Sequence, residues 1–187
     1  MAVVKKLKGK KISLGPISKK YIPTLAKWMN DLEVVKYTDQ AHKKHTEETS
    51  KIYLEACLNE LGTHYYGIFT KKEKLIGGID LREISYTQRS ALLGIAIGEK
   101  QYWGKGYGTE AVTLLLDYAF NILNLNNIML TVFEFNKRAI NCYKKAGFKV
   151  IGKRRNSRFF AGKYYDEIYM DILAKDFKKS SIRELIK

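Results

Sequence analysis

Apolar residues along the first third of the chain recur three or four positions apart, which is the spacing of amphipathic helices. Polar residues and glycines at the ends of these patterns mark the element boundaries. The expected elements are a strand at 11–14, a helix opened by Ser18, a helix at 32–36 capped by Asp31, and a helix from Thr46 to Gly62. The apolar positions of that last helix are Ile52, Leu54, Cys57, Leu58 and Leu61.

After residue 63 the pattern changes to short β-rich runs, interrupted by two further helices. The segment 90–98 is almost continuously apolar, which predicts a central strand that is buried on both faces. The expected elements are strands at 64–70 and 74–84 joined by a charged turn, the strand at 90–98, a helix ending near Leu123, a strand at 127–133, a helix at 136–146 stopped by Gly147, and a hairpin of 148–160 and 163–173. The residues expected on the inner face of the first of these helices are Ala111, Leu114, Leu115, Tyr118 and Ile122.

Helices and strands alternate, but hairpins also occur, and this combination predicts an α/β protein with a mixed sheet. The length of 187 residues fits one domain, expected over residues 1–187. Hydrophobic residues make up 45% of the chain and charged residues 28%, close to globular averages, which excludes a disordered or collagen-like protein.

The charge is strongly positive, because 34 basic and 19 acidic side chains give a net charge of +15. Such a charge attracts anions, including nucleic acid, phosphorylated cofactors and ribosomes, but a lysine-rich solvated surface explains the same excess. A basic cluster at 153–155, with Arg158, is either a docking surface for a nucleic-acid-bearing partner or a charged strand edge that prevents aggregation. We favour the strand edge.

Cys57 and Cys142 lie far apart without a C-x-x-C motif, and the three histidines do not form H-E-x-x-H. We therefore expect neither a disulfide framework nor a bound metal. No apolar run approaches the roughly 18 residues of a membrane span. The basic N-terminus lacks a following apolar region, so we expect no signal peptide, no membrane association and a cytoplasmic location.

Three alternating glycines, Gly104, Gly106 and Gly108, separate the apolar strand from the next helix. They allow the backbone to approach a ligand closely, and the helix start has no strong side-chain cap, so a bound anion can satisfy its free N–H groups. A plain turn needs fewer glycines, which favours phosphate binding. The spacing excludes a P-loop, since Gly98 lies one residue too far away, and a Rossmann fingerprint, since Thr109 replaces the third glycine.

The segment 103–108, Trp-Gly-Lys-Gly-Tyr-Gly, resembles the pyrophosphate loop of the GNAT acetyltransferases, Gln/Arg-x-x-Gly-x-Gly/Ala, with Trp103 in place of the usual Gln or Arg. Residues 94–97 resemble the central strand of that family, and residues 136–148 resemble its N-x-x-A-x-x-x-Y-x-K-x-G-F signature. The resemblance covers about residues 10–175. It implies a GNAT-like fold, which is a splayed, mostly antiparallel mixed sheet with helices on both faces.

By this resemblance the chain is an N-acetyltransferase that uses acetyl-CoA as cosubstrate. The central strand would pair its exposed backbone with the pantetheine arm. Four basic residues can meet the phosphates, with a solvated basic face as the alternative for the last two: Lys105, Arg138, Lys144 and Lys145. Asn136 can hold the arm by amide hydrogen bonds or cap its helix, and both roles stay open. The expected cofactor-binding residues are Ile95, Ala96, Ile97, Trp103, Gly104, Lys105, Gly106, Tyr107, Gly108, Thr109, Asn136, Arg138 and Lys144.

Acetyl transfer to an amine requires a thioester beside the amine, a base for the ammonium proton and a proton donor for the departing thiolate. The resemblance makes Tyr143 the proton donor, with an ordinary core tyrosine as the alternative. Cys142 points about 100° away around the helix, which favours direct attack over an acetyl-cysteine. Asp80 or Glu83 is the expected base. Strand alternation places them on opposite faces, so at most one faces the cleft, and a water relay is the alternative.

The resemblance leaves two classes of primary amine as acceptor, which are protein or peptide N-termini, including ribosomal ones, and polyamines such as spermidine or other small amines. A protein of charge +15 repels a free polycation, so we expect a protein or peptide N-terminus. The carboxylates that a polyamine would need are scattered in the sequence: Asp31, Glu33, Asp39, Asp80 and Glu83.

Association with the ribosome and formation of a homodimer are further expectations. The alternatives from other classes are a CoA-binding protein without catalysis and a basic nucleic-acid-binding module. No helix-turn-helix, RNP or zinc pattern supports the second of these.

Overall fold

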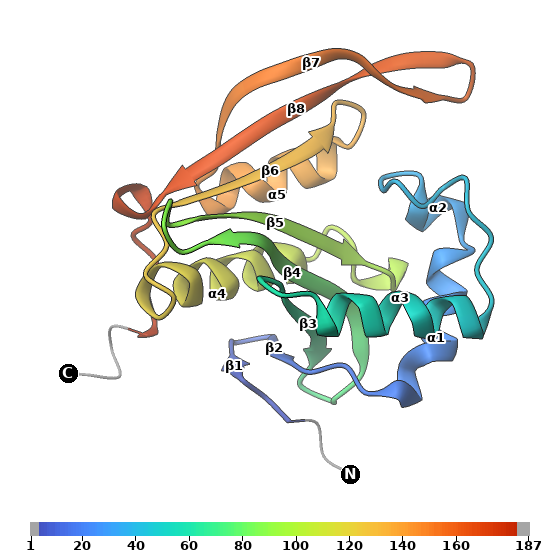
Figure 1. Cartoon of the computed structure of the whole chain (residues 1–187), viewed down its shortest axis with the longest axis horizontal. Coiled ribbons are helices and arrows are strands. Elements are labelled where there is room, and N and C mark those ends of the chain that lie inside the picture. Colours follow the sequence, from blue (N-terminus) through green and yellow to red (C-terminus); the bar gives the residue numbers. More distant parts are fainter. Residues whose placement is uncertain (1–3, 183–187) are drawn as a thin grey trace.

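The computed structural model describes residues 4–182, so residues 1–3 and 183–187 of the expected domain lie outside the described residues. An eight-stranded sheet with the order β1-β2-β3-β4-β5-β6-β8-β7 runs through this part of the chain (Figure 1). The strands are β1 (Leu7–Lys8), β2 (Ile12–Gly15), β3 (His64–Thr70), β4 (Leu75–Ser85), β5 (Ser90–Ile97), β6 (Asn127–Phe133), β7 (Lys149–Phe160) and β8 (Lys163–Leu173). Only the β5–β6 pair is parallel, which confirms the predicted mixed, mostly antiparallel sheet.

Three of the helices in the described residues begin at a residue whose side chain caps them. Asp31 accepts a hydrogen bond from the Glu33 amide, and Thr46 forms a capping box with Thr49, as capping chemistry favours. The helices are α1 (Ile22–Met29), α2 (Leu32–Val35), α3 (Glu47–Asn59), α4 (Tyr107–Asn121) and α5 (Lys137–Ala146), with 3-10 turns at Lys19–Tyr21, Lys100–Tyr102 and Ala174–Asp176. No helix among residues 4–182 is long and apolar enough to cross a membrane.

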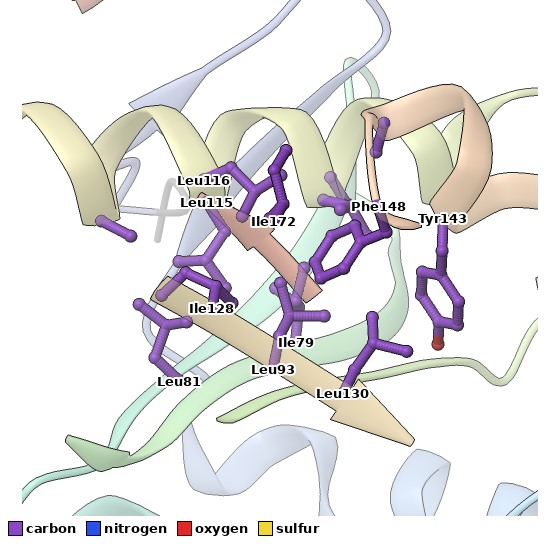
Figure 2. Close-up of a cluster of buried hydrophobic side chains, with 14 of the residues drawn as sticks. Ile79, Leu81, Leu93, Leu115, Leu116, Ile128, Leu130, Tyr143, Phe148 and Ile172 are labelled. Atoms are coloured by element: carbon purple, nitrogen blue, oxygen red, sulfur yellow. The ribbon is translucent and has the colours of Figure 1, made fainter. Parts of the chain in front are cut away.

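Helices cover both faces of the sheet (Figure 1). The α4–α5 face holds the larger core, in which Leu115 and Leu116 of α4 pack with sheet residues such as Ile79 (Figure 2). The opposite face carries a smaller core, where Leu25 of α1 and Leu54 of α3 pack on the sheet. Alternate residues of each strand point to opposite faces, so the sheet separates these two cores. This arrangement confirms the predicted fold class.

Two helices expose apolar residues of the predicted pattern. Of the five apolar positions of α3, Leu54 is buried, whereas Leu61 lies beyond the helix and is 99% exposed. The helix ends at Asn59, before Gly62, because Glu60 already leaves the helical conformation. The prediction that Ile122 faces inward is wrong. This residue follows the last turn of α4 and is exposed.

β5 lies in the centre of the sheet as predicted, but it is not buried on both faces. Ala91 and Leu93 are buried, while Ala96 is exposed. The cause is that β5 pairs with β6 only at its first three residues, Ser90 to Leu92, after which the two strands diverge (Figure 1). β4 pairs with β5 as far as Ile97, so only the β6-facing edge of β5 lacks a partner strand. The candidate functional site lies in the gap that this divergence leaves between β5 and β6.

β7 is the outermost strand of the sheet, and its first eight residues are exposed. Lys153 in this segment pairs with Asp166 of β8 at 2.7 Å. A basic side chain on an outer strand discourages pairing with another chain. The position of β7 agrees with the interpretation of residues 153–155 as a charged strand edge.

Candidate active site

A cavity of about 580 Å³ opens where β5 and β6 diverge. Residues from both faces of the sheet line it, including Trp28 of α1 and Tyr143 of α5. Most of the site residues that the sequence predicts line this cavity. They are Asp80, Ile95, Ala96, Ile97, Trp103, Gly104, Gly106, Gly108, Thr109, Asn136, Arg138 and Tyr143.

Four of the predicted site residues lie outside the cavity wall. Glu83 is exposed at an irregularity of β4, where its φ of +53° takes the chain out of register with β5. The side chains of Lys105 and Lys144 are exposed, and Lys144 lies about 100° around α5 from the face that lines the cavity. Tyr107 packs against a neighbouring tyrosine ring at 5.0 Å. The structure therefore does not bring these four side chains to the site.

The glycine segment ends in a helix start that has no side-chain cap. Gly104 and Gly106 have φ angles of +71° and +84°, a left-handed conformation that residues with a Cβ rarely adopt. Gly106 is the N-cap of α4, and the first helical hydrogen bond runs from the Glu110 amide to its carbonyl. The amides of 107–109 precede that bond, so they have no intrahelical partner. Free amides and the positive end of the helix dipole together favour an anion here.

The unpaired edge of β5 forms the floor of the cavity. Ile95, Ala96 and Ile97 all contribute to its wall. One group of this edge is satisfied by Trp103, whose indole N–H donates to the Ile97 carbonyl at 2.7 Å. The remaining β6-facing groups after Leu92 have no partner strand, and such groups bind polar ligands in extended conformations.

α5 brings polar groups to the side of the cavity opposite β5. The side-chain oxygen of Asn136 accepts a hydrogen bond from the Ala139 amide at 3.2 Å, so Asn136 caps the helix, which is one of its two expected roles. The guanidinium of Arg138 lies 3.6 Å from the centre of the Trp103 ring. This stacking holds a positive charge beside the glycine segment.

Tyr143 lies two turns along α5 from Asn136 and is 6% exposed. Its ring stands at the edge of the larger core with the hydroxyl directed away from α5 (Figure 2). Among residues 4–182 no group hydrogen-bonds to that hydroxyl. Burial raises the pKa of Tyr143 well above its usual range, and the neighbouring Cys142 and Asp80 add to the effect. The hydroxyl therefore stays protonated at neutral pH and is free to donate.

Cys142 also lines the cavity, although helix geometry places it about 100° around α5 from Tyr143. The opening is wide enough to take in both residues of α5. The Thr109 hydroxyl donates to the Cys142 sulfur at 3.3 Å, which ties α5 to α4. Burial raises the pKa of this thiol, which keeps it protonated and a poor nucleophile.

Asp80 faces the cavity from β4 with a side chain that is 16% exposed. Its neighbours Ile79 and Leu81 belong to the α4–α5 core, so Asp80 points to the other face of the sheet. Across the sheet it pairs with Tyr65 of β3 and Gly94 of β5. Burial raises the pKa of Asp80, and the nearby charge of Arg82 partly offsets this. A carboxylate with a raised pKa is a stronger base than one in water.

The geometry can be compared with proteins of known family. Residues 11–149 match the family model that describes an acetyltransferase (GNAT) domain. The chain belongs to the GNAT acetyltransferase family. It is therefore an acyltransferase whose acetyl donor is acetyl-CoA.

Several relatives of this GNAT chain are similar over most of their length. The spermidine N(1)-acetyltransferase of Escherichia coli K12 is 29% identical over 166 residues, covering 89% of this chain and 88% of the relative. That of Vibrio cholerae is 29% identical over 152 residues, covering 81% and 87%. A crystal structure of the Vibrio cholerae spermidine N-acetyltransferase in complex with CoA and spermine has a TM-score of 0.80 and 25% identity, covering 90% of this chain and 98% of that one.

The residues of this GNAT cavity fit the chemistry of acetyl-CoA. The open N-terminus of α4 and the guanidinium of Arg138 suit phosphate oxygens, and the free edge of β5 suits the amides of an extended arm. A Cβ built on Gly104 has no atom within 4 Å, so the loop leaves room for a ligand against its backbone. The sequence predicted these contacts from the glycine spacing and the family signature.

Sequence reasoning missed Tyr37, Tyr65 and Arg82, which also line the cavity. Tyr37 packs edge-on against Trp103 from the segment after α2, a contact between residues 66 positions apart that no local pattern predicts. A usable signal existed for Arg82, which closely approaches Gly94. Gly94 interrupts an otherwise apolar strand, and such a glycine often marks a close approach of another group.

Proposed function

We propose that this GNAT enzyme transfers the acetyl group of acetyl-CoA to a primary amine of a small polyamine-type acceptor. The observation that carries the proposal is the single cavity beside the free edge of β5 that both Asp80 and Tyr143 line. The relatives support a polyamine acceptor better than the protein or peptide N-terminus that net charge alone suggested.

The local charges of the cavity also support a cationic acceptor. Asp39, Asp80 and Glu167, which come from three separate segments, all line the cavity. Two of these carboxylates have a basic partner at 3.4 Å, which is Arg158 for Asp39 and Arg82 for Asp80. Two of the other acidic residues considered above, Asp31 and Glu33, lie outside the cavity wall and pair with Lys100. The net charge of +15 acts over long distances that salt screens, whereas carboxylates in the cavity wall act at contact. The local arrangement therefore outweighs the overall charge in choosing the acceptor.

The proposed binding mode uses the backbone for the cosubstrate. The amides at the start of α4, with Arg138 above them, hold the phosphates, and the β6-facing groups of β5 hold the pantetheine arm. The thioester then lies where the cavity passes between β5 and β6, near Tyr143. The acceptor enters from the face covered by α1 and α3, to which Asp80 points.

The chemistry then needs two proton transfers. A free alkylammonium has a pKa of about 10, so Asp80 accepts its proton, directly or through a water. The amine nitrogen forms a bond to the acetyl carbon while the bond from that carbon to sulfur breaks. Tyr143 donates a proton to the departing sulfur. Because Asp80 acts as a base only when ionised, activity should fall as the pH drops through its raised pKa.

The test measures release of free CoA thiol with spermidine or an N-terminal peptide as acceptor, at physiological salt. We expect the kcat/KM for spermidine to exceed that for the peptide by about tenfold or more, since the cavity carboxylates attract a polycation. Asp80→Asn should lower kcat by about 10²-fold. Glu83→Gln, which removes a carboxylate three residues away and outside the cavity, should leave kcat unchanged. A preference for the peptide would overturn the polyamine assignment.

A further inference from the structure

Arg82 brings a positive charge into the cavity next to the proposed base. It lies two residues after Asp80 on β4, so both side chains project from the same face of the strand. Its Nη1 lies 3.4 Å from Oδ1 of Asp80, which is long for a hydrogen bond, and its side chain is 49% exposed. Among residues 4–182 its guanidinium has no other hydrogen-bond partner, so most of its donors are free.

Gly94 makes room for this pair of charges. A Cβ built on Gly94 would lie 2.7 Å from Oδ2 of Asp80 and 2.9 Å from Nη1 of Arg82, distances that real Cβ atoms do not show. The carboxylate and the guanidinium thus lie over the backbone of β5 at this one position. A side chain there would displace both groups, so the glycine leaves the room that they occupy.

The other cations of the cavity wall lie on its cosubstrate side. Arg138 stacks on Trp103, and Lys145 belongs to α5, which carries Tyr143. Arg82 instead lies on β4, where the acceptor amine must approach Asp80. An acceptor that brings its ammonium to this carboxylate replaces the weak contact with Arg82, and its remaining groups then face a freed guanidinium.

We propose that Arg82 sets the charge selectivity of the acceptor site by repelling a positive charge close to the reacting amine and favouring a neutral or anionic group there. A polyamine must then direct its further positive charges away from Arg82, toward Asp39 and Glu167 of the same cavity wall. This inference rests on the proposed small-amine acetyltransferase function. The physical reason is that unlike charges attract and like charges repel within a cavity of lower dielectric than water. The planar, permanently charged guanidinium also matches a carboxylate or phosphate in shape.

Three short amines of matched chain length separate this effect from general binding: butylamine, 1,4-diaminobutane and 4-aminobutanoate. They differ only in whether the far end is neutral, cationic or anionic. In Arg82→Gln, the ratio of kcat/KM for the diamine to that for the aminobutanoate should rise by about tenfold or more over wild type. Arg82→Lys keeps the charge but loses the planar shape, so its ratio should lie between that of wild type and that of Arg82→Gln.

The matched control is Arg155→Gln, which removes the same charge from an exposed position of β7 outside the cavity. This variant should leave the ratio unchanged. If Arg82→Gln changes the kcat/KM of all three amines in parallel, Arg82 has only a structural role and the inference is overturned. If wild type acetylates none of the three amines nor spermidine but retains acetyl-CoA binding, the proposed function fails, and the selectivity inference fails with it.

Discussion

The N-termini of α4 and α5 both reach the cavity, but they are capped in different ways. α4 begins at Gly106, which has a φ of +84° and offers no side chain to the free amides. α5 begins at Asn136, whose side-chain oxygen takes the Ala139 amide. One helix end thus keeps its amides available for a ligand, and the other satisfies one of them internally.

This difference assigns different tasks to the two helices. The open end of α4 contributes backbone amides and the helix dipole, which suit the phosphates of acetyl-CoA. The capped helix α5 is held in place and contributes side chains, with Arg138 near its start and Tyr143 two turns further on. Substitutions at the start of α4 should therefore change cosubstrate affinity. In α5 the same is expected of Arg138, whereas substitution of Tyr143 should change turnover and loss of the Asn136 cap should change stability.

The largest effect is expected from Tyr143→Phe in α5. Loss of the proton donor should lower kcat by about 10²–10⁴-fold while the Kd for acetyl-CoA changes little. Steady-state kinetics and calorimetry measure the two quantities separately. Tyr164→Phe, at an exposed position of the β7–β8 hairpin, is the control and should leave both unchanged. Turnover close to that of wild type would show that Tyr143 only packs in the core and does not donate the proton.

Gly106→Val tests the open end of α4. Valine disfavours a positive φ and places a branched side chain where the phosphates are expected, so the Kd for acetyl-CoA should rise by about 100-fold or more. Gly162→Val is the matched control for Gly106→Val. Gly162 has a φ of +79°, and no atom lies within 4 Å of a Cβ built on it. It lies in the β7–β8 turn, outside the cavity wall. The Gly162→Val variant should destabilise the protein similarly without weakening acetyl-CoA binding. Equal binding losses in both variants would contradict the contrast between the helices.

The smallest effect is expected from the cap of α5. Asn136→Ala should lower the free energy of unfolding by about 1 kcal/mol, as measured by denaturant titration, because the Ala139 amide loses its partner. Asn136→Asp keeps an acceptor oxygen and should keep most of the stability. Since Asp lacks the amide donor, weaker acetyl-CoA binding in Asn136→Asp would show that the residue also holds the pantetheine arm.

Local patterns were sufficient to predict the elements around the glycine segment. The strand at 127–133 and the final strand at 163–173 have the predicted bounds, and the helix stopped by Gly147 begins one residue later than predicted, with Asn136 as its cap. These elements are predictable because alternation, turn residues and a left-handed glycine act over a few neighbouring residues. Burial was harder to predict. Ala96 is exposed because β6 turns away from β5, and that divergence depends on strands far apart in the sequence.

The candidate site likewise has features that the sequence could predict and features that it could not. Strand alternation correctly allowed only one of Asp80 and Glu83 to face the cavity, but the choice depended on an irregularity near Glu83 that no sequence pattern indicates. Arg82 was missed because its importance comes from the space above Gly94 on the neighbouring strand. The part of the site expected to bind acetyl-CoA through backbone groups could be predicted from spacing along the chain. The acceptor part could not, because it arises from contacts across the sheet.

The gap between β5 and β6 links the stability of the protein to the concentration of its cosubstrate. In the proposed binding mode, the arm of acetyl-CoA occupies the place of a missing strand and completes the hydrogen bonding of the β5 edge. A ligand that binds only the folded chain raises its stability by about 2.7 kcal/mol at 100 times Kd. The melting temperature of this enzyme should therefore rise with the concentration of acetyl-CoA. Amide exchange along residues 94–97 should slow when the cosubstrate completes the sheet.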